Sequence, residues 1–492
     1  MANTKIPNEL LELSVKTFGT SSIMIGDTTT GTIDAANYNT GVGVDVFAAL
    51  TTGDSNSAFG TFALSSNTTG SKNTALGYGT LNSNSTGYNN VAIGYGTLLL
   101  NTTGLQNTGV GYNSLNANTT ASNNAAVGYN ALSANTTGTQ NTALGSAAGR
   151  SCTTGGHNVA IGYAALDAST TGGDNVSIGR YAMILNTTGA ANVGIGSNAM
   201  YANTTGNYNT AIGYGSLDAN TTASYNIAMG YLSGTRNTTG TRNSIIGTFS
   251  GSYVTTGNDN TTLGYAALGS ASTGYTNTAI GSRCLASVST GNDNTAVGYY
   301  AGGYQNQITT GTDNTVIGAY ARTSSAAGVG QIVIGRYALG QGNNTATVGL
   351  SGNGATINID GSDTSWAAHS DERLKENILT STAGLSFIND LRPVTYTWKA
   401  KNAISKDFKH YYDADSTDPV NGVAGKTYHG FVAQEMKATI DAHSEVANGN
   451  NLWAERIDDI QQVAPSNLMP MMVKAIQELS AEVETLKSQL GE

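Results

Sequence analysis

The amino-acid sequence predicts a mainly β protein: a trimeric parallel β-solenoid or β-roll rod of 17-residue repeats, followed by an α+β domain that ends in a trimeric coiled coil. Three observations predict this fold. A 17-residue repeat fills the middle of the chain, the composition changes abruptly at about residue 370, and apolar residues recur three and four apart near the C-terminus. Self-similarity at a fixed period is typical of repeat architectures.

A glycine recurs every 17 residues from Gly43 to Gly298, through sixteen consecutive repeats without one insertion, and the spacing then loosens. The consensus of the repeat is N-T-A-I-G-Y-x-A-L-x-x-x-T-T-G-x-x. Seventeen residues can supply two or three short strands with their turns, but not a pair of helices. Val, Ile, Thr and Tyr favour extended backbone, and Gly and Asn interrupt it. The repeat therefore predicts a β-solenoid.

Fixed columns of the repeat predict how successive coils contact one another. The two glycines are expected at turns that require a positive φ. Because coils stack at about 4.8 Å, the Asn before the first glycine is expected to form a hydrogen-bonded ladder and the Tyr after it a stacked one. Sixteen coils then span on the order of 75–80 Å. The apolar residues of each coil are few and small, so trimerisation is expected to supply the missing core.

Charge and glycine content divide the chain at about residue 370. Residues 1–369 carry 24 charged residues and 57 of the 63 glycines, whereas residues 370–492 carry 30 charged residues and six glycines. So abrupt a shift indicates a domain boundary. We expect an N-terminal segment at 1–36, a repeat shaft at 37–350, a distal tip and linker at 351–369, and a separate domain over the rest.

The C-terminal domain shows ordinary amphipathic patterning. Residues 385–399 predict a helix followed by a strand, and residues 428–436 predict a strand that leads into a helix. Six apolar residues then recur at spacings of 4, 3, 4, 3 and 4, as in the a/d seam of a coiled coil. The six are Met472, Ile476, Leu479, Val483, Leu486 and Leu490.

The composition argues against several classes of partner and cofactor. The net charge is −10 without a basic patch, so nucleic acid is not expected as a partner. No run of about 18 apolar residues exists, and the first residues lack the apolar core of a secretory signal, so we expect no membrane insertion and assembly in a cytoplasm. Five scattered His and two Cys have no metal-ligand spacing, so no metal or other cofactor is expected. Cys284 is expected to be a small buried thiol.

Four motifs of the C-terminal domain resemble one family. They are S-D-E-R-L-K at 370–375, R-P-V-T-Y-T-W-K at 392–399, G-F-V-A-Q-E at 430–435 and L-M-P-M-M-V-K-A-I-Q-E-L at 468–479. In this order they are similar to the intramolecular chaperone auto-processing domain found at the C-terminus of phage tail spikes and fibres. The resemblance covers essentially all of residues 370–492. The repeats before them resemble the head repeats of trimeric autotransporter adhesins and the repeats of several phage tail fibres.

The resemblance implies an activity and a site. The family trimerises its β-structured stalk and then cuts the chain before the Ser of its S-D-x-R-L-K motif, as an autoproteolytic serine peptidase that acts only on itself. Carried over, Ser370 is the nucleophile, Lys375 is the general base, and His369–Ser370 is the scissile bond. A Ser hydroxyl needs a base, and a Lys can serve if burial or a neighbouring cation such as Arg373 lowers its pKa. Taken alone, S-D-E-R-L-K is typical of a helix N-cap.

The sequence does not assign a single role to several other side chains. His429 is equally a packing residue or part of the site, and Gln434 and Glu435 match the family motif without an assigned role. The Tyr column is interpreted as structural stacking, with a sugar-binding stripe as the alternative.

The predicted repeat rod and the C-terminal domain together indicate a phage tail fibre or tail spike protein that adheres to the host surface. We expect a homotrimer located in the virion, bound to the tail or baseplate through its N-terminus and to a host cell-surface receptor, with a glycan as one candidate. The alternatives are a bacterial trimeric adhesin-like surface protein and a polysaccharide-degrading tail spike. The last needs paired carboxylates, and the acidic residues of the repeats are scattered singly.

Overall fold

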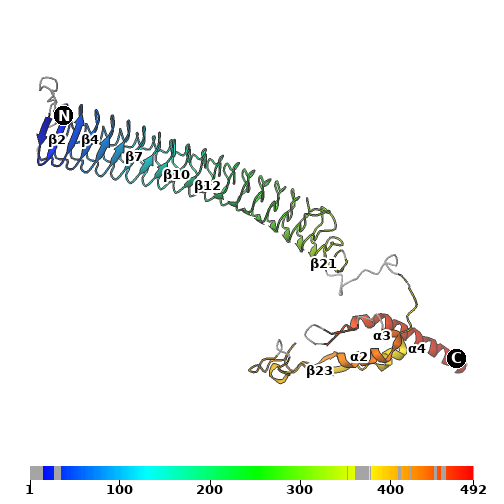
Figure 1. Ribbon diagram of the computed structural model, residues 1–492. Helices are drawn as coiled ribbons and strands as arrows, with labels where there is room; N and C mark the ends of the chain where they lie inside the picture. Colours follow the sequence, from blue (N-terminus) through cyan, green and yellow to red (C-terminus); the bar gives the residue numbers. More distant parts are fainter. Residues whose placement is uncertain are drawn as a thin grey trace, which may run out of the picture. The chain divides into compact units, whose positions relative to one another are not determined.

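The computed structural model of the chain describes residues 15–26, 35–351, 353–360, 376, 378–407, 412–421, 423–447, 452–455 and 461–490. The chain divides into two compact units, Met1–His369 and Ser370–Glu492. The first unit is a long stack of coils, and the second is a small assembly of helices and short strands (Figure 1).

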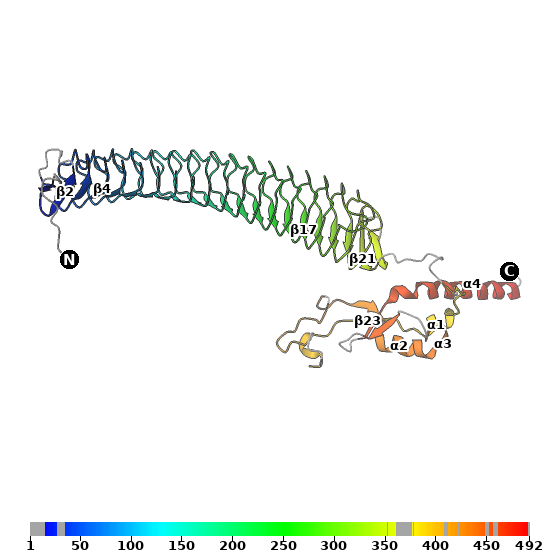
Figure 2. The same ribbon diagram turned by 45° about the horizontal axis from the view of Figure 1, so that its top comes forward.

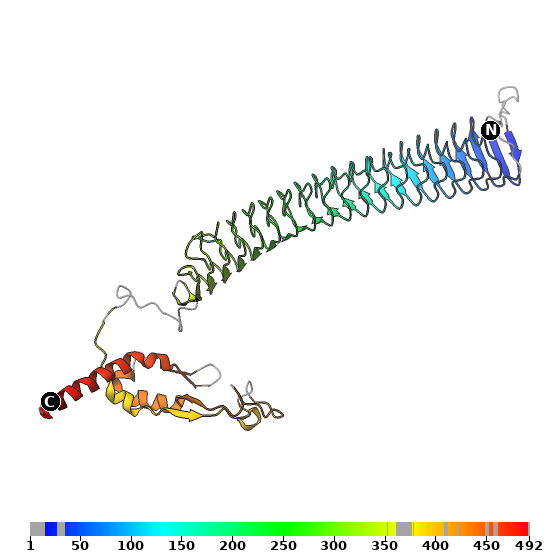
Figure 3. The same cartoon turned by 180° about the vertical axis from the view of Figure 1, so that it is seen from behind.

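The first unit is a parallel β-solenoid in which each coil contributes one short strand to a single sheet. Strands β2 to β21 are joined by nineteen parallel pairings. They lie side by side along the whole stack (Figure 3), which bends gently along its length (Figure 2). At about 4.8 Å a strand the sheet is on the order of 90 Å long. The predicted mainly β solenoid is confirmed.

An antiparallel strand closes each end of this sheet: β1 pairs with β2, and β22 pairs with β21. Two stretches of the predicted segment 1–36, residues 15–18 and 22–26, therefore belong to the sheet. The strands are β1 (Val15–Phe18), β2 (Ser22–Gly26), β3 (Thr40–Gly43), β4 (Ser57–Phe59), β5 (Thr74–Leu76), β6 (Val91–Ile93), β7 (Thr108–Val110), β8 (Ala125–Val127), β9 (Thr142–Leu144), β10 (Val159–Ile161), β11 (Val176–Ile178), β12 (Val193–Ile195), β13 (Thr210–Ile212), β14 (Ile227–Met229), β15 (Ser244–Ile246), β16 (Thr261–Leu263), β17 (Thr278–Ile280), β18 (Thr295–Val297), β19 (Thr315–Ile317), β20 (Ile332–Ile334), β21 (Thr345–Leu350) and β22 (Asn353–Asn358).

The middle residue of each short strand points into the coil, and its two neighbours point outward. In β5, Ala75 is fully buried, whereas Leu76 is 49% exposed. Leu81, further along the same coil, turns back inside and is fully buried. Such residues form continuous core clusters within one chain. The expectation that the core of a single chain is incomplete is therefore wrong for the interior of the coil.

Buried asparagines form two ladders along the stack. In the predicted ladder, the backbone N of Asn73 donates to Oδ1 of Asn56 at 3.0 Å, and Nδ2 of Asn73 donates to the carbonyl of Gly87 at 2.9 Å. A second ladder, not predicted from the repeat, runs through the Asn of Asn-Thr-Thr, where Nδ2 of Asn84 donates to Oδ1 of Asn67 at 2.8 Å. Nδ2 of Asn84 also donates to the carbonyl of Gly87 at 3.0 Å, so both ladders satisfy buried backbone groups as well as one another's side chains.

Tyrosines on the surface form the predicted stacked ladder. The rings of Tyr78, Tyr95, Tyr112 and Tyr129 lie 5.1–5.3 Å apart between centroids, with planes within 12° of parallel. Coil stacking brings each ring over the ring of the next coil, so the column is a consequence of the repeat. Structural stacking is confirmed for these four coils.

The two glycine columns serve different purposes. Gly77 has φ +133°, and a Cβ there would lie 1.8 Å from the carbonyl oxygen of Gly94 in the next coil. Gly87, from Thr-Thr-Gly and its variants, has no left-handed φ, and its Cβ would lie 2.4 Å from the carbonyl oxygen of Gly104. The prediction of positive φ is therefore right for the first column and wrong for the second, which requires Gly for close approach alone. Leu81 supplies a left-handed turn instead, with φ +51°.

The second unit packs short helices and two small antiparallel sheets around one core. Its elements are α1 (Leu385–Asp390), β23 (Val394–Tyr396), η2 (Lys401–Ala403), β24 (Tyr428–Gly430), α2 (Ala433–Ala442), α3 (Ser444–Ala447), β25 (Trp453–Glu455), β26 (Gln461–Val463), η3 (Pro465–Leu468) and α4 (Met469–Leu490). Phe387, Met436, Ile440, Leu452 and Leu468 form most of the core. The predicted helix–strand and strand–helix pairs are both present.

Helix α4 carries the predicted a/d seam on its surface. All six seam residues, from Met472 to Leu490, are exposed in the single chain. Within the described ranges, no helix is both long and apolar enough to cross a membrane.

Candidate functional site

The residues predicted to cut the chain, His369, Ser370 and Lys375, lie outside the residues that the structure describes, as does Arg373. Their roles therefore stay predictions. The structure does describe most of the other three motifs of the C-terminal unit, and it brings them together.

Strands β23 and β24 place two motifs beside each other. Thr395 pairs with His429, and the rings of Tyr396 and Tyr428 lie 6.0 Å apart between centroids. His429 is exposed at a surface hollow of about 520 Å³. The hollow is lined by Pro393, Val394, Thr395, His429, Gly430, Phe431 and Pro465. His429 is thus a surface residue of this hollow and not a core packing residue.

Glu435, to which the sequence assigns no role, forms an ion pair with Arg392. Nε of Arg392 donates to Oε2 of Glu435 at 2.9 Å, and a second contact joins the same two side chains. The guanidinium lowers the pKa of Glu435 through these hydrogen bonds. The pair ties the start of the R-P-V-T-Y motif to the first turn of α2. Both side chains are largely exposed, so we expect the pair to set orientation more than stability.

Helix α4 is attached to helix α1 through one carboxylate. Oε2 of Glu478 accepts a hydrogen bond from the backbone N of Leu385 at 2.7 Å, in the first turn of α1. That bond is the main reason why the pKa of Glu478 is lowered, and Lys474 adds to it at 3.3 Å. A Cβ on Gly384 would lie 2.2 Å from Oε2, so Gly leaves the room that the carboxylate needs. The contact joins the last motif to the first helix of the unit.

His443 lies between two carboxylates. Its Nε2 is 2.8 Å from Oδ2 of Asp390 in α1, and its Nδ1 is 2.8 Å from Oε1 of Glu445 in α3. The ring also meets Phe387 of the core edge-on, at 5.4 Å between centroids. Hydrogen bonding to Asp390 and then to Glu445 raises the pKa of His443 above 6.5. The protonated ring donates to both carboxylates and so links α1 to α3.

This linkage predicts a pH-dependent stability of the C-terminal unit. Because the folded pKa of His443 is raised, its stabilising contribution is complete below about pH 6.5 and is lost as pH rises through the folded pKa. We expect His443→Gln to lower the unfolding temperature by a few degrees at pH 6 and by less at pH 8. Thermal unfolding of the full chain, followed by tryptophan fluorescence, measures this, since Trp398 and Trp453 lie in the unit. Equal losses at both pH values would contradict it, and His429→Gln is the matched control.

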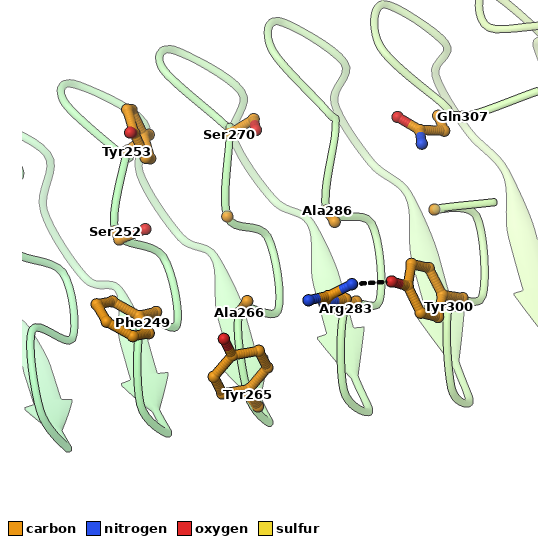
Figure 4. Close-up of a pocket in the computed structure, with 12 residues that line it drawn as sticks. Phe249, Ser252, Tyr253, Tyr265, Ala266, Ser270, Arg283, Ala286, Tyr300 and Gln307 are labelled. Carbon is orange, nitrogen blue, oxygen red and sulfur yellow. Dashed lines mark hydrogen bonds between the residues drawn. The ribbon is translucent and has the colours of Figure 1, made fainter. Parts of the chain in front are cut away.

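The solenoid has a surface groove of about 500 Å³ in its C-terminal half (Figure 4). Its floor consists of the fifth residue after the coil glycine in four successive coils: Ser252, Gly269, Ala286 and Gly303. Several earlier coils carry a larger side chain at that position, such as Tyr201. The groove therefore results from four successive small residues at a variable position of the repeat.

Aromatic rings and one cation border this groove (Figure 4). Phe249, Tyr265 and Tyr300 lie along one side, and Tyr253 stands across the floor from them. Arg283 donates to the hydroxyl of Tyr300, and its Cζ lies 5.9 Å from the ring centroid of Tyr265. The lining includes no Asp or Glu, so the guanidinium has no carboxylate beside it in the groove.

The two cysteines are buried in the coils, as was expected for Cys284. Burial raises the pKa of Cys152 to about 11 and that of Cys284 to about 12, so both stay as unreactive thiols. Among the described residues, no group of three or more His, Cys, Asp or Glu is placed to hold a metal ion.

Fold and surface together define a β-solenoid rod followed by a separately packed C-terminal unit with an unpaired apolar helix seam. Residues 370–444 match the peptidase S74 family model, described as the chaperone of endosialidase. The match supports an intramolecular chaperone with self-cleaving peptidase activity in the C-terminal unit. It begins at Ser370 and ends directly after His443. The searches of curated proteins and of solved structures returned no match to the chain.

Proposed function

We propose that this chain is the structural protein of a phage tail fibre or spike, a homotrimeric rod whose C-terminal unit aligns three chains and then removes itself. One observation carries the proposal: the chaperone match begins at Ser370, behind a solenoid of about nineteen coils. A repeat rod offers many nearly equivalent registers, and long-range parallel pairing forms slowly. A trimeric clamp at one end would fix the register before the coils close.

The proposed cleavage uses Ser370 and Lys375. The neutral amine of Lys375 accepts the hydroxyl proton of Ser370, and Oγ attacks the carbonyl carbon of His369. The bond to the backbone N of Ser370 breaks, that N takes up the proton as the new terminal amine, and the acyl group is held as an ester on Oγ. Water hydrolyses the ester, which frees the carboxylate of His369 and restores the hydroxyl.

Removal of the unit would stabilise the rod kinetically. Helix α4 presents the apolar seam through which three copies can associate. Once residues 370–492 have left, the chains lack the clamp that set their register, so they cannot readily reverse assembly. We propose that the finished rod resides in the virion, after assembly in the host cytoplasm, with its N-terminus on the tail or baseplate.

Intact mass spectrometry of the expressed chain tests this function. We expect two products, one ending at His369 and one beginning at Ser370, together with a threefold mass of the rod in light scattering. A single uncut polypeptide of 50.3 kDa without association would contradict the proposal. Cleavage without association would support self-cleavage and contradict the homotrimer.

The groove favours host-surface adhesion as the task of the rod. Aromatic rings pack against the apolar faces of sugars, and a guanidinium without a carboxylate partner binds acidic groups. We therefore propose the groove around Arg283 as the receptor site, and an acidic saccharide as its ligand. The polysaccharide-degrading alternative needs two carboxylates in one groove, and this groove contains none. A bacterial trimeric adhesin-like protein stays an alternative, since it would use the same rod.

Calorimetry with the purified rod tests the receptor site. Galacturonate oligomers are the acidic ligand, and maltooligosaccharides are the uncharged comparison. We expect the acidic oligomer to bind, and Arg283→Ala to weaken it about tenfold or more, because one charged hydrogen bond is lost. Arg180→Ala is the matched control, since Arg180 also lies over a tyrosine ring, Tyr181, but outside the groove. Equal binding of both sugars, equal losses in both variants, or no binding would contradict the assignment.

A further inference from the structure

An apolar stripe runs along the outer face of the solenoid sheet. It consists of the residue directly before the coil glycine in strands β2 to β21, which is Ile, Val, Leu, Phe or Met in every coil. In eleven coils this side chain is 36–50% exposed, and Leu76 and Leu144 are the most exposed. Soluble monomers rarely leave so long a continuous apolar surface uncovered.

The rest of this outer face is also free of charge. The second outward position of each strand, two residues before the stripe, is Thr, Val, Ser, Ile or Ala throughout. Charged residues of the coils, such as Arg150, Asp167 and the Arg242–Asp259 pair, lie in the segments between the strands instead. Parallel sheets are usually covered on both faces, whereas only the interior of the coil covers this one.

We propose that this face is the interface between copies of the chain in the rod. The inference rests on the proposed homotrimer and assigns the surface that forms it. The face is about 90 Å long and three residues, or about 10 Å, wide, so each copy offers on the order of 900 Å². A stable interface needs about 800 Å² from each partner. The area is sufficient without any other contact.

The occupant that fits this face is a second copy of the same chain. A partner has to match a stripe with one apolar side chain every coil over the whole length, and another copy in register does so. Identical chains meet with identical charges, so an uncharged face avoids repulsion between them. The side chains differ only slightly from coil to coil, so the stripe alone specifies register weakly. That weakness is the reason for a separate clamp at one end.

Matched leucine substitutions test the interface. Leu76→Glu with Leu144→Glu places two carboxylates on the stripe, and Leu100→Glu with Leu185→Glu places two on another face at similar exposure, 44% and 42%. Sedimentation of the full chain after expression is the readout, with circular dichroism to verify the fold. We expect the stripe variant to associate at least a hundredfold more weakly than the wild type, and the control pair to match the wild type. A trimer that survives in the stripe variant would overturn the interface but not the homotrimer, whereas a monomeric wild type would overturn both.

Cysteine cross-linking keeps the inference testable if the glutamate variant fails to fold. Ile195 lies on the stripe and Leu185 lies off it, and both native cysteines are buried. With a short bis-maleimide, we expect Ile195→Cys to give covalently joined chains and Leu185→Cys to give none. Cross-linking of Leu185→Cys alone would place the interface on another face and overturn the inference.

Discussion

Replacing Ser370 by Ala will leave the expressed chain uncut, as one polypeptide of 492 residues. Without the hydroxyl no ester can form, and we expect cleavage to fall roughly a thousandfold or more. Mass spectrometry and gel electrophoresis over time measure the loss. Ser405→Ala is the matched control in the same unit, because the Ser405 hydroxyl contacts Asp407 within its own turn. Cleavage of the Ser370→Ala chain at the wild-type position would rule out Ser370 as nucleophile.

Replacing Lys375 by Arg separates charge from basicity at the proposed site. The guanidinium keeps the positive charge, but its pKa is too high for it to act as a base, so we expect nearly the same loss as with Ser370→Ala. Lys426→Arg is the control, since Lys426 lies over the ring of Tyr428 on the surface of the same unit. A Lys375→Arg chain that cuts itself at the wild-type rate would assign Lys375 a purely electrostatic role.

Replacing Gly179 by Ala will destabilise the rod strongly. Gly179 has φ +130°, and a Cβ would lie 2.6 Å from the carbonyl carbon and oxygen of Gly196 in the next coil. Backbone strain and the clash together cost about 2–5 kcal/mol. Because each coil contacts only its neighbours, we expect local opening around β11 and β12 before the rest. Denaturant unfolding gives the loss, and hydrogen exchange locates it.

The control for this substitution is Gly342→Ala in the same unit. Gly342 has no left-handed φ, and the nearest atom to an added Cβ is a methyl group of Thr345 at 3.9 Å. Its effect should stay within about 0.5 kcal/mol. Similar losses of unfolding free energy in both variants would contradict this account, because they would show that the repeat glycine is not needed for the close approach of coils.

Much of the rod follows from the repeat itself. Once residues 17 apart lie above one another, Asn73 must meet Asn56 and Tyr95 must meet Tyr78, so both ladders were predictable from spacing. The helix of α4 was equally predictable from its apolar seam. The second ladder through Asn84 was available in the same way, because Asn recurs 17 residues apart in the Asn-Thr-Thr segments. The column is less regular than the first, because Cys, Ser, Val or Ala replaces Asn in some coils.

The sequence by itself determined the solenoid, its period and the change of composition near residue 370, because each is a local pattern repeated along the chain. Only the tertiary structure decided which way each column points. The same hydrophobicity describes Leu76 and Leu81, yet a left-handed turn at Leu81 buries one side chain and leaves the other outside. Contacts such as Arg392 to Glu435 and Glu478 to Leu385 join residues far apart in the chain. No local pattern encodes such pairs, because they exist only once the elements between them have packed.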